Sequence, residues 1–135
     1  MSLDFEGKVA IVTGSGGGIG KGYALELGKR GAKVVVNDLG GAVDGSGGSL
    51  TAAETVVKEI QDNGGDAMAN GANVCNQDEV KNMVEQAMEK WGRVDVLVNN
   101  AGILRDKSFA KMPWEDFVTV VNVHLLGSAL CAHTV

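Results

Sequence analysis

Short apolar runs alternate along the chain with longer segments in which apolar residues recur every three or four positions. Residues 8–13, 33–37 and 94–98 are rich in valine and isoleucine, and residues 66–70 form a weaker run. Runs of this length and composition are typical of strands that are buried on both faces. Strands that alternate with helices predict a parallel sheet with right-handed crossovers, covered by helices on both faces.

The segment 77–91 has the clearest helical pattern in the chain. Its apolar residues lie at positions i, i+3, i+4, i+7, i+8 and i+11, which places them on one face of a helix. Asn76 and Glu79 fit the N-cap and N3 positions of this helix. Further helices are predicted from about Leu50 and, near the end of the chain, from about Pro113.

The first helix is predicted over residues 19–30. Ile19, Tyr23 and Leu27 are spaced by four there, which favours a helix. Four strands and four helices therefore follow one another in alternation. We expect residues 1–135 to form one domain of the α/β class, with a doubly wound parallel sheet.

Composition and charge argue against several classes of protein. The chain has 135 residues, of which 44% are hydrophobic and 21% are charged, as in ordinary soluble globular proteins. A net charge of −5 disfavours binding to nucleic acid, which needs clustered basic residues. No uninterrupted apolar run approaches the ~20 residues that span a bilayer. Cys75 and Cys131 lack metal-ligand spacing, so we predict buried reduced thiols and no bound metal.

Glycine is in marked excess, with 20 residues in the chain. Five of them lie in TGSGGGIG, residues 13–20, between the first strand and the first helix. A helix N-terminus offers unpaired N–H groups and the positive end of its dipole, which together suit a pyrophosphate. Gly14 would permit the tight turn, Gly18 the approach of the phosphates, and Gly20 close packing of helix on strand. The alternative is a glycine turn with a purely structural role.

Asp38 stands at the end of the second strand, at about the interval from the glycine turn that dinucleotide-binding folds use. A carboxylate there can accept hydrogen bonds from an adenosine ribose and would repel a 2′-phosphate. The predicted cofactor is therefore NAD rather than NADP, and the alternative is a solvated aspartate that caps the loop. Asn73 and Val74 follow the third strand, and residues 99–102 follow the fourth. Because ligands collect at the carboxyl ends of parallel strands, one cleft is expected.

TGSGGGIG, the aspartate of VVVND, and LVNNAG together resemble the short-chain dehydrogenase/reductase family, over nearly the whole chain. The resemblance implies the N-terminal part of a Rossmann-like fold that binds NAD. It adds Ser15 and Ile19 to the cofactor site, sets Asn73 and Val74 beside the adenine, and puts the NNAG segment beside the nicotinamide ribose. The implied cofactor-binding residues are Gly14, Ser15, Gly18, Ile19, Gly20, Asp38, Asn73, Val74, Asn99, Ala101 and Gly102.

Within this family, NDLGGAVDGSGGS and NNAGILRDKSF resemble the (3R)-hydroxyacyl-CoA dehydrogenase units of peroxisomal multifunctional enzymes of type 2. A long glycine-rich loop after the second strand distinguishes that subfamily. The resemblance implies oxidation of a 3-hydroxyacyl-CoA by NAD in fatty-acid β-oxidation, a homodimer or homotetramer, and a peroxisomal rather than cytoplasmic location. The alternatives are another NAD-dependent short-chain dehydrogenase, acting on a hydroxysteroid or a polyol, and a non-catalytic nucleotide-binding module.

The proton-transfer residues of the family have no counterpart in the chain. Family members carry a tyrosine, a lysine four residues later and a preceding serine, and the tyrosine is the general acid/base. The one tyrosine here is Tyr23, and Leu27 stands four residues after it. We therefore expect the chain to end before the catalytic Tyr-x-x-x-Lys segment and to be inactive as a dehydrogenase by itself.

His124 stands three residues before Gly127, where many family members have an asparagine that supports a proton relay. The resemblance implies His124 as a supporting catalytic residue, and the alternative is a histidine of the core or of an interface. Its helix is expected to direct inward the face formed by Phe117, Val121, His124 and Ser128. The loop residues 105–107 could meet an acyl-CoA, and we interpret them as solvated.

Overall fold

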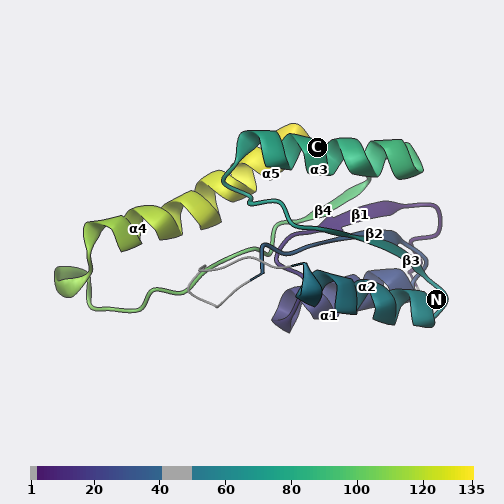
Figure 1. The fold of residues 1–135 in the computed structure, drawn as a ribbon, viewed down its shortest axis with the longest axis horizontal. Helices are drawn as coiled ribbons and strands as arrows, with labels where there is room; N and C mark the ends of the chain where they lie inside the picture. Colours follow the sequence, from purple (N-terminus) through teal and green to yellow (C-terminus); the bar gives the residue numbers. More distant parts are fainter. Residues whose placement is uncertain (1–2, 41–49) are drawn as a thin grey trace.

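The computed structural model describes residues 3–40 and 50–135, so most of the second glycine-rich loop lies outside the described residues. In the described part, four strands form one parallel sheet in the order β3-β2-β1-β4 (Figure 1). The strands are β1 (Val9–Val12), β2 (Lys33–Asn37), β3 (Asp66–Asn70) and β4 (Val96–Val98). Each lies within a predicted run. The strand order reverses at β1, which is the topological switch point of a doubly wound fold.

Helices cover both faces of the sheet (Figure 1). α1 (Gly18–Lys29) and α2 (Thr51–Asp62) lie on one face, and α3 (Gln77–Trp91) and α5 (Ser128–Thr134) lie on the other. The remaining helix, α4 (Trp114–Val121), extends away from the sheet (Figure 1). Ala10 and Val12 of β1 pack into the core on the side of α1 and α2, whereas Ile11 packs with α3 and α5. Successive residues of β1 therefore point to opposite faces and are all buried, which explains its unbroken apolar run. The predicted fold class is confirmed.

The predicted helix α1 is present, and its fully buried residues are small ones rather than its large apolar ones. Ile19 and Tyr23 are 71% and 49% exposed. The buried residues of α1 are instead Gly20, Ala24 and Gly28. These small residues let the helix approach the sheet and α2 closely. The spacing of large apolar residues indicates the helix but not its buried face, because glycine contributes no hydrophobic signal to the pattern.

The predicted bounds and N-cap of α3 are confirmed. The helix spans Gln77–Trp91, and the Asn76 side chain accepts a hydrogen bond from the Glu79 N–H at 3.0 Å. At the other end, Trp91 Nε1 donates to Asp66 Oδ2 at 3.0 Å. That bond ties the end of α3 to the start of β3, so the helix is fixed at both ends.

The last predicted helix is interrupted by a π-helical segment, Asn122–Gly127, between α4 and α5. Its i→i+5 hydrogen bonds turn the following side chains relative to a continuous α-helix. The predicted inward face is wrong. Phe117 is 37% exposed and His124 is exposed, whereas Gly127 and Cys131 are buried.

The helical stretch Trp114–Thr134 is long and apolar enough to cross a membrane by length and composition, with a mean hydropathy of 1.4 and only 11% of that window buried. Core helices of soluble proteins meet the same criterion, so this property alone does not identify a membrane span. The absence of a membrane span stays a prediction. Among the exposed apolar residues of this stretch, Trp114 stacks on Phe117 with 5.0 Å between ring centroids.

Asp95, just before β4, joins two strands that are far apart in the sequence. Its Oδ2 accepts a hydrogen bond from the Val9 N–H at 2.9 Å, and its Oδ1 lies 2.7 Å from Arg93 Nη2. The Arg93 hydrogen bond, together with the Val9 N–H, lowers the pKa of Asp95 from its ordinary value of 3.8 to about 2. The ionised carboxylate therefore stabilises the fold at neutral pH.

Replacing Asp95 by asparagine is expected to lower the free energy of unfolding at neutral pH. A carboxyl with a lowered folded-state pKa stabilises above its unfolded pKa and loses this contribution as the pH falls toward about 2. The deficit of the variant should therefore be full near neutrality and shrink below about pH 4. Urea unfolding across this pH range measures it, with Asp62→Asn on the surface of α2 as the control. A deficit that is the same at every pH would contradict the electrostatic explanation.

Candidate nucleotide-binding site

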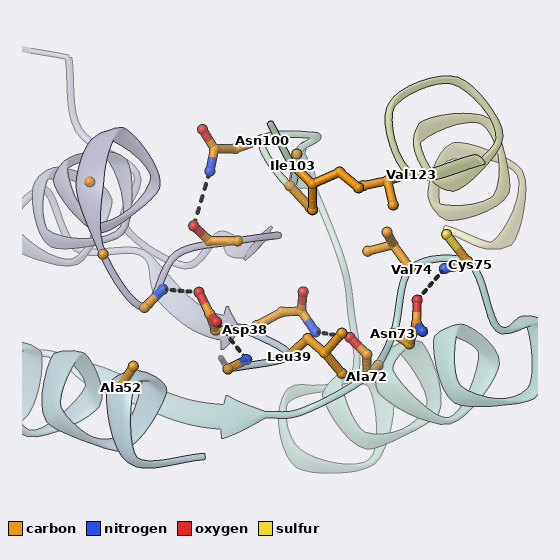
Figure 2. A pocket seen from close by; sticks show the side chains of 18 of the residues that line it. Asp38, Leu39, Ala52, Ala72, Asn73, Val74, Cys75, Asn100, Ile103 and Val123 are labelled. Carbon is orange, nitrogen blue, oxygen red and sulfur yellow. Dashed lines mark hydrogen bonds between the residues drawn. The ribbon is translucent and has the colours of Figure 1, made fainter. Parts of the chain in front are cut away.

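A cavity of about 690 Å³ lies at the carboxyl ends of the strands (Figure 2). Its walls come from the segments that follow β1, β2, β3 and β4, and from the junction of α4 with the π-helical segment. The predicted cofactor residues that line it are Gly14, Gly18, Asp38, Asn73, Val74, Ala101 and Gly102. The structure therefore brings four separate segments together at one cleft, as the strand order requires.

Four predicted cofactor residues lie outside the cavity wall. Ser15 is fully buried, and its Oγ donates to the Val12 carbonyl at 2.7 Å, which supports the glycine turn from behind. Ile19 is 71% exposed, and Gly20 is buried in α1. Asn99 donates from Nδ2 to a carbonyl of α5 at 3.1 Å. Ser15, Gly20 and Asn99 thus shape the site without lining it.

Asn100 ties the glycine turn to the end of β4. The N–H groups of Asn100 and Ala101 donate to Thr13 Oγ1 at 3.1 and 3.0 Å. The Asn100 amide donates to the carbonyls of Thr13 and Gly14 at 3.1 and 3.0 Å. Gly14 has a φ of +65°, and a Cβ there would lie 2.8 Å from Ala101 Cα, so only glycine fits this approach.

Asp38 is held in the cavity by two backbone N–H groups. Its Oδ2 accepts from the Gly16 N–H at 2.8 Å, and its Oδ1 accepts from the Gly40 N–H at 2.7 Å (Figure 2). The second bond is the loop-capping contact of the alternative interpretation, and the first joins the aspartate to the glycine turn. A carboxylate offers about four lone-pair positions, so these bonds leave it able to accept more from a ribose.

The segment after β3 forms another wall of the cavity (Figure 2). Asn73 Oδ1 accepts a hydrogen bond from the Cys75 N–H at 2.9 Å, which fixes the local turn. Val74 is buried. Cys75 was predicted to be buried as well, but it is exposed and lines the cavity, because it lies within the turn that leads into α3.

His124 contacts the backbone beside the cavity rather than the cavity itself. Its Nε2 lies 3.1 Å from the Ile103 nitrogen and 3.0 Å from the Ile103 oxygen, and its ring lies against Gly102. Asn122 and Val123 line the cavity from the same π-helical segment. His124 therefore fastens the segment after β4 to the last helix.

The interpretation of Arg105 as a solvated loop residue is wrong. Arg105 lines the cavity, and its Nη1 lies 2.7 Å from Asp116 Oδ1, with both side chains largely buried. Asp116 belongs to the first turn of α4. Together with His124, this ion pair holds the loop between β4 and α4 at two points.

Several residues that no motif indicated also line the cavity. They include Asn37, Ala52, Ala72, Thr119, Asn122 and Val123. Asn37 and Ala72 adjoin predicted residues in the sequence, whereas the others reach the cavity only through the packing of α2 and of the last helix. In the part of the chain that the structure describes, no group of three or more His, Cys, Asp or Glu side chains could hold a metal ion.

A glycine turn at the first crossover, an acidic residue after β2 and a cavity at the switch point define a dinucleotide-binding α/β domain. The chain belongs to the short chain dehydrogenase family, and the match covers residues 8–135. The resemblance inferred from TGSGGGIG, VVVND and LVNNAG is confirmed.

The relatives agree with the subfamily that the sequence indicated. The chain is 55% identical over 126 residues to the peroxisomal hydratase-dehydrogenase-epimerase of Saccharomyces cerevisiae, covering 93% of this chain and 14% of that protein. It is 49% identical over 126 residues to the peroxisomal multifunctional enzyme type 2 of Mus musculus, covering 93% of this chain and 17% of that protein. The chain thus spans a small part of each relative.

A solved structure of a 7α-hydroxysteroid dehydrogenase is similar to the whole described fold. That protein, complexed with NADH and 7-oxo glycochenodeoxycholic acid, matches with a TM-score of 0.86 and 36% sequence identity. The match covers 98% of this chain and 48% of that one. Membership of this family supports binding of a nicotinamide cofactor.

Proposed function

We propose that this chain is the NAD-binding part of a dehydrogenase that transfers hydride between NAD and a 3-hydroxyacyl-CoA in fatty-acid β-oxidation. The observation that carries the cofactor assignment is the Asp38 carboxylate, held beside the glycine turn by the Gly16 N–H at 2.8 Å. The substrate assignment is supported by the two relatives named as peroxisomal hydratase-dehydrogenase and multifunctional enzymes. The chain covers 14% and 17% of those relatives, so their other activities are not assigned to it.

The cavity residues fit such a cofactor. The unpaired N–H groups at the start of α1 would bind the pyrophosphate, where Gly18 leaves space. Asp38 would accept hydrogen bonds from the adenosine ribose, and Asn73 and Val74 would flank the adenine. Ala101 and Gly102 would lie beside the nicotinamide ribose. NAD supplies the hydride acceptor when it is bound, and the chain's own part is to bind and orient it.

Binding measurements test this assignment directly. Isothermal titration calorimetry of the chain is expected to give tighter binding of NAD than of NADP, by about tenfold or more, because the carboxylate of Asp38 repels a 2′-phosphate. Tighter binding of NADP would overturn the role of Asp38, and binding of neither nucleotide would overturn the proposed function.

Turnover by the chain alone is expected to be absent. The general acid/base of the family is a tyrosine with a lysine four residues later, and Tyr23 lies half-exposed on α1 with Leu27 in the corresponding position. An NADH absorbance assay with a 3-hydroxyacyl-CoA checks this expectation. Formation of NADH by the purified chain, above a boiled control, would show that another group accepts the alcohol proton.

We also propose that His124 is a positioning residue for proton transfer. It holds the Ile103 backbone, directly after Ala101 and Gly102 of the cavity wall. In a polypeptide that joins this chain to the family's tyrosine and lysine, His124→Ala is expected to lower kcat and alter its pH profile, with little change in KM for NAD. His124→Asn should restore much of the rate, since its amide also offers a donor and an acceptor. An unchanged pH profile in His124→Ala would leave only a packing role.

We propose the cellular location from the same relatives, and the oligomeric state from the family. Their names support a peroxisomal location for the protein, and membership of the family supports a homodimer or homotetramer that acts on a small molecule of the acyl-CoA type. Fluorescence microscopy of a tagged protein checks the first proposal, and sedimentation equilibrium checks the second. A uniformly cytoplasmic signal would contradict the peroxisomal location.

A further inference from the structure

Asn70, the last residue of β3, forms hydrogen bonds with the segment that follows β2 and with the segment that follows β3. Its backbone carbonyl accepts a hydrogen bond from the Asp38 N–H at 3.0 Å. Its side-chain Oδ1 accepts one from the Ala72 N–H at 2.9 Å. Asp38 and Ala72 both line the cavity, whereas Asn70 does not and is only 7% exposed. One buried residue therefore joins the ribose-facing aspartate to the start of the adenine-facing wall.

A second asparagine and a glutamine complete the hydrogen bonds of the Asn70 side chain. Asn37 is the register partner of Asn70 across β2 and β3, and it is 1% exposed. Its Nδ2 donates to Asn70 Oδ1 and to the Ala72 carbonyl, both at 3.0 Å. Asn70 Nδ2 donates to Gln86 Oε1 of α3 at 3.1 Å. In the described part of the chain, no buried side-chain nitrogen or oxygen lacks a partner, so this network is complete.

The hydrogen bonds that join Asn37, Asn70 and Ala72 are buried, and this part of the network is rigid because each group that moved would leave another polar group unpaired in a low-dielectric interior. Adenosine would have to contact Asp38 and the Asn73–Val74 wall at the same time. A fixed separation between these two contacts lowers the ordering cost that binding must overcome. The network lies directly behind both contacts. It meets the glycine turn only through the backbone carbonyl of Asn37, which accepts a hydrogen bond from the Ser15 N–H at 2.8 Å. The side-chain hydrogen bonds of Asn70 itself go to Asn37, Ala72 and Gln86, and none of these residues belongs to the glycine turn or to the segment after β4.

We propose that Asn70 is a positioning residue for the adenosine half of the nucleotide. It sets the separation between Asp38 and the adenine-facing wall, and it acts through those residues without touching the ligand. This inference rests on the proposed NAD site. It predicts an effect confined to one half of the nucleotide, which a residue that only stabilises the fold would not produce.

The test is Asn70→Leu, which keeps the approximate volume but removes every side-chain hydrogen bond. Its control is Ile60→Val, a loss of one buried methylene at the far end of α2, away from the cavity. Calorimetry with AMP and NAD, and an NMR titration with nicotinamide mononucleotide, are run at a temperature where circular dichroism shows every variant folded. We expect Asn70→Leu to bind AMP and NAD about tenfold or more weakly, with nicotinamide mononucleotide unchanged. Ile60→Val should lower the unfolding midpoint and bind all three as the unmodified chain does.

Equal AMP affinity in Asn70→Leu and the unmodified chain would overturn the inference, and so would an equal loss for AMP and nicotinamide mononucleotide. Failure of the unmodified chain to bind AMP or NAD would instead overturn the proposed function. If Asn70→Leu does not fold, Asn70→Thr takes its place. Threonine suits a strand end and can still accept from the Ala72 N–H, but it loses the bonds to Asn37 and Gln86. The same selective loss for AMP is expected, and no loss would overturn the inference.

Discussion

Replacement of Asp38 by asparagine is expected to weaken NAD binding by about 10- to 100-fold and to abolish most of the preference over NADP. A hydrogen bond to a charged group is worth about 1.5–3 kcal/mol, and asparagine loses the charge and one acceptor oxygen, so a fold-change of this size is expected. Asparagine keeps one oxygen that can accept from the Gly16 N–H, so the turn should stay intact. Loss of the negative charge also removes the repulsion of a 2′-phosphate.

Calorimetric titrations with NAD and NADP measure both effects on the same variant. Asp62→Asn on the surface of α2 is the matched control, because it removes the same charge far from the cavity. An Asp38→Asn chain that still binds NAD as tightly as the control would mean that the carboxylate only caps the loop after β2.

A single methyl group at position 16 is expected to weaken NAD binding by about tenfold or more. In the structure, a Cβ on Gly16 would lie 2.8 Å from Asp38 Cγ and 2.9 Å from Ala52 Cβ. Real Cβ atoms do not approach other heavy atoms so closely, so Gly16→Ala must displace the carboxylate, the start of α2, or both. The contact with Asp38 by itself requires the carboxylate to move away, which disrupts the 2.8 Å bond between the Gly16 N–H and Asp38.

The neighbouring glycine provides the control for this prediction. A Cβ on Gly17 would have no heavy atom within 4 Å, and the Gly17 φ of −167° is an extended conformation that any residue adopts. Gly17→Ala should therefore keep the NAD-to-NADP affinity ratio of the unmodified chain, even if its methyl group, which lies near the phosphates, weakens the binding of both nucleotides. Gly16→Ala should lower that ratio, and equal ratios in the two variants would contradict the crowding argument.

The periodicity of apolar residues predicted most of the fold, because the strands of the sheet and the helices that cover it each carry a local sequence pattern. The bounds of α3, β2 and β3 are as predicted, since each segment carries its own signal in apolar spacing, capping or β-branched residues. The face of α1 could not be predicted in the same way, because close packing there depends on the absence of side chains at Gly20 and Gly28. The π-helical segment Asn122–Gly127 carries no local signal either.

The site was predictable where it consists of backbone and a single charge, and unpredictable where it depends on contacts distant in sequence. Gly14 and Asp38 lie at fixed points of a strand–turn–helix pattern, so spacing alone indicated them. Asn100 contacts turn residues that precede it by 86 and 87 positions in the sequence, and Arg105 meets Asp116 only once α4 is in place. Such pairs require the tertiary structure, because nothing in one sequence marks two distant residues as partners.

The strand order implies a sequence of events during synthesis. β1 lies between β2 and β4 in the sheet, yet Asp95 follows its partner Val9 by 86 residues. Because a nascent chain emerges from its N-terminus, β1, β2 and β3 can pair long before β4 exists. The side of the cavity between Asp38 and Val74, where we propose that adenosine binds, would then assemble first. The other side of the cavity can form only after Asn100 has been synthesised. A ribosome-bound intermediate would therefore expose one edge of β1 and half of the proposed nucleotide site.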